Sequence, residues 1–135
     1  MKFLKNVFKT TMFDRENLFS NEQAFTGDGP STDAVDLGTE PQRKGSNRHA
    51  MLSITETFAG AASATLSLQS DVVDSFSAAV DNITIPMDNL SAGENYVVPL
   101  PKDLHRFVRI YLTFDVPPTA GAVTAGIVLD CEAEY

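Results

Sequence analysis

The sequence predicts an all-β protein, an antiparallel β-sandwich or jelly roll with an N-terminal arm. From Met51 onward, apolar residues recur with a period of two, which is the repeat of a strand with one buried face. Runs rich in Gly, Pro, Ser and Asn separate these apolar stretches at short intervals, as turns do. No segment after residue 20 has the length and periodicity of the helices that connect parallel strands.

Length and composition indicate one globular domain. The chain has 135 residues, of which 43% are hydrophobic and 21% charged, and a chain of this size buries roughly two thirds of its unfolded surface. We expect residues 1–15 to form an arm and residues 16–135 a single sandwich domain. Eighteen acidic and ten basic residues give a net charge of -8, which opposes binding to nucleic-acid phosphates.

The sequence also predicts synthesis in a cytoplasm and no membrane association. Lys5 and Lys9 interrupt the apolar N-terminal residues, so no signal-peptide core is present. No window approaches the ~20 apolar residues of a membrane span. Cys131 is the only cysteine, so the fold needs no internal disulfide, although this thiol could cross-link two subunits.

The predicted elements follow in chain order. Residues 14–48 contain dense turn signals, among them Gly27, Gly29 and Pro30, and are expected to be long surface connections. The strands after them are marked by pairs of apolar residues two positions apart. These pairs are Leu52 and Ile54, Leu66 and Leu68, Ile83 and Ile85, and Val98 and Leu100.

The last two predicted strands have the clearest patterns. In "FVRIYLTF" (107–114) every second residue from Val108 to Phe114 is apolar, which predicts one buried face. In "TAGAVTAGIVLD" (119–130) Val123, Ala125, Ile127 and Leu129 alternate with residues that include Gly126. Small residues in a strand suit a place where another backbone comes close, so we expect this strand to pack the core and Gly126 to lie against a second subunit.

The residue types that catalysis or metal binding needs are not arranged for it. There is no GxSxG, GxxxxGK[ST] or GxGxxG motif, and His49, His105 and Cys131 lack metal-ligand spacing. The aspartates around Gly29 could offer oxygen ligands to calcium, but the EF-hand order is absent, and turn formation is the expected role of Asp28, Asp33 and Asp36. The sequence therefore predicts no enzyme and no catalytic, cofactor or metal-binding residue.

Charge is distributed unevenly along the chain. All ten basic residues lie within 1–48 or 102–109, whereas 49–101 contains six acidic residues and no Lys or Arg. One hypothesis is that the basic segments contact an acidic partner and leave the acidic middle in solvent; the alternative is a solvated surface with uneven charge. The candidate contact residues are Lys2, Lys5, Lys9, Arg43, Lys44, Arg48, Arg106 and Arg109.

The N-terminal residues offer a second candidate contact. Leu4, Val7 and Phe8 have i, i+3, i+4 spacing, so they would share one apolar face if residues 2–9 were helical. A helix this short is marginal alone and needs a surface to lie on. The alternative is a frayed terminus.

Four segments resemble one protein family in their order and spacing. They are "ENLFSNEQAFTGDGPSTDAVDLG" (16–38), "TLSLQSDVVDSFS" (65–77), "YVVPLPKDLHRFVRIYLTF" (96–114) and "PPTAGAVTAGIVLD" (117–130). Over about residues 12–131 the chain resembles the jelly-roll capsid cement (decoration) proteins of tailed phages. It departs from that pattern in roughly eleven additional N-terminal residues and in a long, basic loop at 39–50.

The resemblance implies a structural virion protein on the exterior of an icosahedral head. Its expected partners are the major capsid protein, whose neighbouring subunits it would clamp, and a second copy of itself in a homodimer, with a trimer as the alternative. Another phage component, such as a head-completion or tail subunit, would share most of these sequence features. A receptor- or glycan-binding sandwich would need aromatic platforms, and the chain has no Trp and only Tyr96, Tyr111 and Tyr135.

Overall fold

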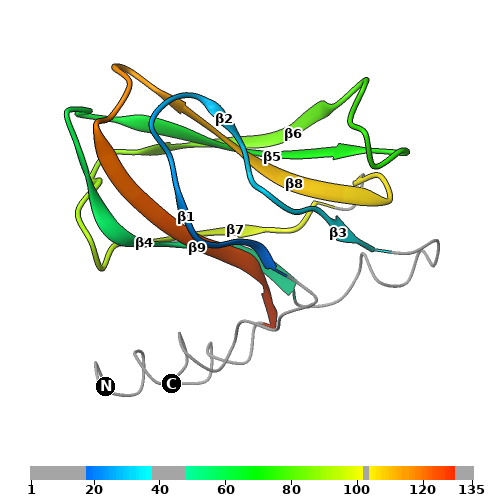
Figure 1. Ribbon diagram of the computed structural model, residues 1–135. Coiled ribbons are helices and arrows are strands. Elements are labelled where there is room, and N and C mark those ends of the chain that lie inside the picture. Colours follow the sequence, from blue (N-terminus) through cyan, green and yellow to red (C-terminus); the bar gives the residue numbers. More distant parts are fainter. Residues whose placement is uncertain (1–17, 38–47, 102–103, 130–135) are drawn as a thin grey trace.

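The protein is an all-β sandwich of two antiparallel sheets, as the sequence predicts. The computed structural model describes residues 18–37, 48–101 and 104–129, and the predicted arm at 1–15 lies outside this part of the chain. Figure 1 shows the two sheets stacked face to face, with β1, β4, β7 and β9 in one layer and β2, β3, β5, β6 and β8 in the other.

The first layer, here called the β9 sheet, has the strand order β1-β9-β4-β7. Strand β9 pairs with β1 on one side and β4 on the other, so strands from both ends of the described chain meet in this sheet. Strand β7 closes the far edge by pairing with β4. The bounds are β1 Leu18–Ala24, β4 Arg48–Ala59, β7 Asn95–Pro99 and β9 Ala120–Leu129.

The second layer, here called the β8 sheet, has the order β2-β8-β5-β6, and β3 also pairs with β8. Strand β5 lies between β6 and β8 and pairs with both along most of its length. The bounds are β2 Gly29–Pro30, β3 Val35–Asp36, β5 Ala64–Asp71, β6 Val80–Met87 and β8 Phe107–Phe114.

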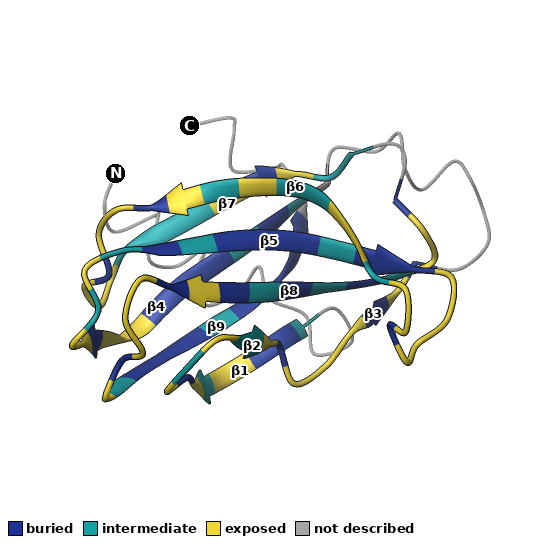
Figure 2. Ribbon diagram, turned by 90° about the horizontal axis from the view of Figure 1, so that it is seen from above, coloured by how far each residue is buried: buried dark blue, intermediate teal, exposed yellow. Residues whose placement is uncertain are grey.

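The core lies between the sheets and follows the period of two. In β8 the four predicted inward residues, from Val108 to Phe114, are all buried in it, and so are Val123, Ala125 and Ile127 of β9. Figure 2 shows dark blue buried positions along β4, β5, β8 and β9. Burying each large aliphatic side chain contributes about 1.5–3 kcal/mol, so alternation along these strands selects the face that turns inward.

The expectation that residues 14–48 form only surface connections was wrong, because β1, β2 and β3 lie within this range. Strand β1 escaped detection because its alternation is broken. Its register with β9 shifts twice, and Glu22 has a left-handed φ of 51°. Phe19 is nevertheless fully buried in the core. The strand predicted around Val98 and Leu100 ends slightly earlier, at Pro99.

One end of the core is filled by aromatic rings that require a glycine beside them. The ring centroids of Phe58 and Phe114 lie 5.1 Å apart, and Phe25 is 6.4 Å from Phe114. Gly121 has a φ of +141°, and a Cβ at this position would lie 2.1 Å from Cδ1 of Phe58. Gly121 therefore lets β9 pass directly against the Phe58 ring.

We expect Gly121→Ala to destabilise the protein by about 3–5 kcal/mol, because backbone strain and overpacking add together. Gly93→Ala is the matched control, since Gly93 also has a positive φ of +98° but open space around the added Cβ. The control should lose only about 1–2 kcal/mol. Urea unfolding monitored by circular dichroism measures both, and equal losses would contradict a steric role for Phe58.

Candidate interaction surface

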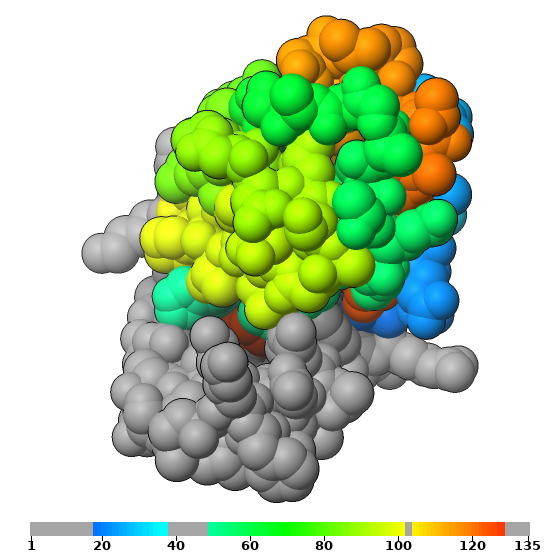
Figure 3. All heavy atoms as spheres, turned by 90° about the vertical axis from the view of Figure 1, so that its left-hand side faces the viewer, coloured from blue at the N-terminus to red at the C-terminus, as the bar shows by residue number. Residues whose placement is uncertain are grey.

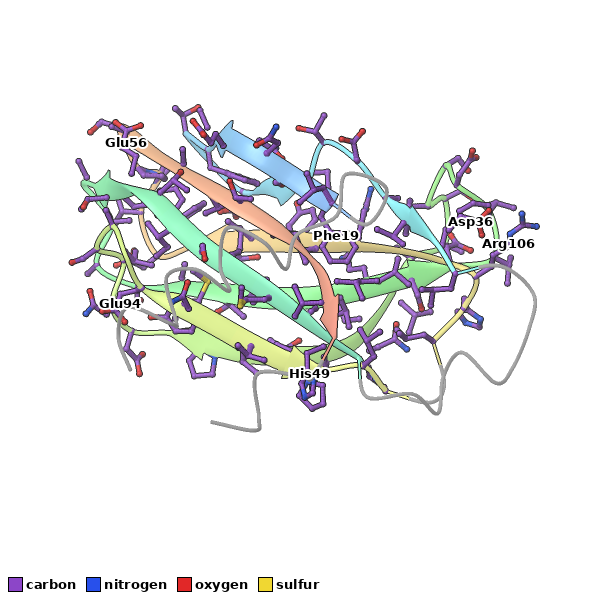
Figure 4. All side chains as sticks on the ribbon, turned by 90° about the horizontal axis from the view of Figure 1, so that it is seen from below. Phe19, Asp36, His49, Glu56, Glu94 and Arg106 are labelled. Atoms are coloured by element: carbon purple, nitrogen blue, oxygen red, sulfur yellow. The ribbon has the colours of Figure 1, made fainter. Side chains whose placement is uncertain are left out.

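One end of the sandwich is acidic. The loops 25–28, 60–63, 88–94 and 115–119 meet there, and Figure 3 looks on to this end. No Lys or Arg among the described residues lies in these loops. Figure 4 shows Glu56 and Glu94 at the opposite end from Arg106. This acidic end carries Asp28, Glu56, Asp88, Glu94 and Asp115.

The opposite end, here called the arginine end, has the described basic residues. Arg48 begins β4, Arg106 directly precedes β8 and Arg109 lies near the start of β8. The described segments also break off at this end, before Leu18, between β3 and β4, between β7 and β8, and after β9. The undescribed segments therefore join the sandwich here. They contain the remaining predicted contact residues Lys2, Leu4, Lys5, Val7, Phe8, Lys9, Arg43 and Lys44, which lie outside the described residues.

Arg106 is held by an acidic neighbour that lies far from it in the sequence. Its Nε and Nη2 donate to the two carboxylate oxygens of Asp36 at 2.7 and 2.9 Å. The hydrogen bonds and charge of Asp36 raise the pKa of Arg106 above its ordinary value. Both side chains are close to half exposed, so the pair contributes little stability, but it fixes the direction of the guanidinium group. Part of the Arg106 charge is offset within the chain.

Arg109 belongs to a polar row on the outer face of the β8 sheet. Its Nε donates to Oε1 of Gln69 at 2.8 Å, and Nε2 of Gln69 donates to Oδ1 of Asp81 at 2.8 Å. The guanidinium group also lies 4.3 Å from the ring centroid of Phe76, within the range of a cation–π contact. Arg109 thereby links β8, β5 and the loop that follows β5.

That loop, residues 72–79, exposes apolar side chains and is here called the valine loop. Val72 is 63% exposed and Val73 is also exposed, as is Val80, the first residue of β6. Phe76 is instead buried and has a left-handed φ of 54°. Such strain in a bulky residue persists only where the surroundings hold it, and here Arg109 stacks on the ring. The sequence analysis missed this surface, although two adjacent valines inside a turn cluster were an available signal.

Asp71 fixes the valine loop at both of its ends. Its Oδ1 accepts from the backbone N–H of Val72 at 2.6 Å, and its Oδ2 from that of Ala78 at 2.8 Å. Hydrogen bonding from Ala78, followed by smaller contributions from Val72 and Val73, lowers the pKa of Asp71 despite partial desolvation. The exposed valines are therefore presented on an ordered backbone.

Gly126 lies on the outer face of the β9 sheet and is buried there. It pairs with Leu18 of β1 and Met51 of β4. This position agrees with a close approach of other atoms, and the predicted contact of Gly126 with a second subunit stays a prediction.

Two of the three aspartates considered as calcium ligands, Asp28 and Asp36, have partners within the fold. Oδ1 of Asp28 accepts from the backbone N–H of Phe114 at 2.8 Å, and Asp36 pairs with Arg106. No group of three or more His, Cys, Asp or Glu residues that could hold a metal ion occurs in 18–37, 48–101 and 104–129. Those same ranges contain no helix long and apolar enough to cross a membrane.

Comparison with known families adds one finding. The model of the Bbp16 family matches residues 19–127, which span the sandwich from β1 to β9. The chain belongs to the Bbp16 family. No curated protein matches it. The matched range leaves the N-terminal residues that include Leu4, Val7 and Phe8 outside the family pattern.

We expect acid to weaken the valine loop through Asp71. A carboxyl group with a lowered folded pKa stabilises the fold above its unfolded pKa of about 3.9. This contribution is lost as the pH falls through the folded value. Asp71→Asn should therefore be less stable than the wild type at neutral pH and depend less on pH below about pH 4. Urea midpoints measured across this range give the comparison.

The exposed Asp74 of the same loop provides the control. Asp74→Asn removes one negative charge nearby and should preserve the acid-dependent slope of the wild type. Parallel pH curves for Asp71→Asn and the wild type would contradict the role assigned to Asp71.

Proposed function

We propose that this protein is a capsid cement protein. In this role it binds the outer surface of a phage head and stabilises contacts between neighbouring major capsid protein subunits. The observation that carries the proposal is the difference between the two ends of the sandwich. The described arginines and the valine loop lie at one end, whereas the loops of the other end hold acidic residues and no described Lys or Arg. The sequence resemblance to cement proteins supplies the class of partner.

The arginine end suits attachment to a protein shell. Val72 and Val73 offer apolar surface, and arginine is among the residues that contribute most to protein interfaces. The valine loop is already ordered by Asp71 and Arg109, so less conformational entropy is lost on binding. Contacts of modest strength suffice where one molecule touches several shell subunits, because linked contacts add avidity.

The acidic end suits the outward direction. Its five acidic residues, together with a net charge of -8 for the chain, make decorated surfaces repel one another, and like charge keeps particles dispersed. This orientation matches the sequence-based hypothesis that basic segments face an acidic partner. Seven of the ten basic residues belong to segments that leave the described chain at the arginine end.

The proposal extends to assembly and location. The partners are the major capsid protein and a second copy of this chain in a homodimer, with a trimer as the alternative. The protein is made in the host cytoplasm, resides on the virion exterior and catalyses no reaction. A head-completion or tail subunit would bind in one ring, so electron microscopy of labelled particles separates it from cement, which covers the head in many copies.

The direct test is cosedimentation of the purified protein with undecorated phage heads, followed by heating of decorated and bare heads. We expect saturable binding in many copies per head and a higher temperature of DNA release for decorated heads. Protein that stays in the supernatant at every salt concentration would overturn the proposal.

Substitutions at the two ends test the orientation. Val72→Asp should weaken binding to heads by roughly tenfold or more, because it places a charge in an apolar contact. Val116→Asp is the matched control, since Val116 is 51% exposed in a loop of the acidic end, and its binding should equal that of the wild type. Equal weakening by both substitutions would rule out attachment through the arginine end.

Charge reversal of Arg43, Lys44 and Arg48 tests the electrostatic part separately. We expect weaker binding and a smaller dependence of affinity on salt, because fewer complementary charges meet at the interface. Unchanged affinity and salt dependence would remove this basic segment from the contact surface.

A further inference from the structure

The outer face of the β9 sheet carries an apolar row that crosses all four strands. Leu18 of β1 is paired with Gly126 of β9, Gly126 with Met51 of β4, and Met51 with Val97 of β7. Cross-strand partners point to the same side of a sheet. Because Val98 of β7 belongs to the core, its neighbour Val97 faces outward. The apolar row therefore consists of Leu18, Gly126, Met51 and Val97.

The position of Val128 shows that this face is covered near the row. The core contains Ile127 but not Val128, so Val128 points outward with Gly126. Strand β1 begins at Leu18, opposite Gly126, so no described strand lies beside Val128 on that side. Val128 is nevertheless only 3% exposed, while Val97 at the other end of the row is 49% exposed. No strand of the described chain lies below this sheet in Figure 1.

The two outer faces of the sandwich differ in chemistry at this point. On the β8 sheet the corresponding surface is the polar row of Arg109, Gln69 and Asp81, whose hydrogen bonds satisfy one another. The apolar row has no such hydrogen-bond network, and covering its side chains with other apolar groups is favourable because it removes apolar surface from water. The row is therefore suited to contact with the apolar face of an amphipathic segment.

We propose that residues 2–9 of this chain form a short amphipathic helix that docks on the outer face of the β9 sheet, with Leu4, Val7 and Phe8 toward the apolar row. The chain enters the sheet at Leu18, itself a member of the row. The intervening residues 10–17 can span up to about 26–29 Å when extended. An eight-residue helix is about 12 Å long, comparable to the roughly 14 Å across four strands.

Composition favours this segment over the other chain end. Residues 2–9 combine apolar residues at helical spacing with three lysines and no acidic residue, so the opposite helix face is cationic and suited to water. Residues 130–135 contain three acidic residues among six, which oppose burial on an apolar surface. Docking also supplies the tertiary surface that a helix of this length requires.

The experiment uses oxidation of methionine by hydrogen peroxide in the full-length protein, with each site followed by peptide mass spectrometry. Met51 reports on the apolar row, and Met87, which is fully buried in the core, reports on the fold. Methionine oxidation follows exposure. Val7→Asp and Phe8→Asp should each make Met51 react several-fold faster and leave Met87 protected. Asn6→Asp, on the opposite helix face, is the matched control and should react as the wild type.

Three results would overturn the proposal. The first is an equal Met51 rate in Val7→Asp, Phe8→Asp and Asn6→Asp. The second is a Met51 rate in the wild type that rises on about hundredfold dilution, because it would assign the cover to a second copy. The third is faster Met51 oxidation after deletion of residues 130–135, with Met87 still protected. No phage head takes part in these measurements, so their outcome is independent of the proposed function.

Discussion

The sandwich depends on β9 lying between β1 and β4. This placement joins the two ends of the described chain in one sheet, and its inward residues form part of the core with β8 and β5. Because the partners are far apart in sequence, loop-closure entropy is lost before the pairing contributes stability. Gly121 shows how closely β9 must approach its neighbours, since its backbone runs against the Phe58 ring. The pairing of β9 with β1 and β4 therefore also sets where the two ends of the sandwich and the outer face of the β9 sheet lie.

The same arrangement sorts the loops by chemistry. Antiparallel strands send alternate connections to opposite ends. The connections at one end hold acidic residues and no described Lys or Arg, while the described arginines and the valine loop lie at the other. The local contacts at the arginine end are specific: Asp71 fixes the loop backbone and Arg109 holds the strained Phe76. A rigid sandwich that presents an ordered loop with exposed valines beside arginine side chains at one end is suited to binding a large partner in one orientation.

Sequence periodicity predicted the strands that obey it and missed those that do not. The alternation in 107–114 correctly gave both faces of β8, because each inward residue is large and apolar. Strand β1 was missed because bulges interrupt its register. The ion pair of Arg106 with Asp36 could not be predicted either, since it joins residues seventy positions apart. The gathering of the described arginines at one end and the contiguity of the apolar row required the strand order, which periodicity alone does not contain.

Leu18 and Leu129 both lie at the arginine end, and this has a practical consequence for engineering. A foreign domain joined directly to Leu18 or to Leu129 would be carried on the side proposed to face the shell and would compete with attachment. A peptide inserted at Gly93, whose surroundings are open, would project from the acidic end instead. The β6–β7 connection, rather than either end of the described sandwich, is thus the rational position for displaying an antigen on this scaffold.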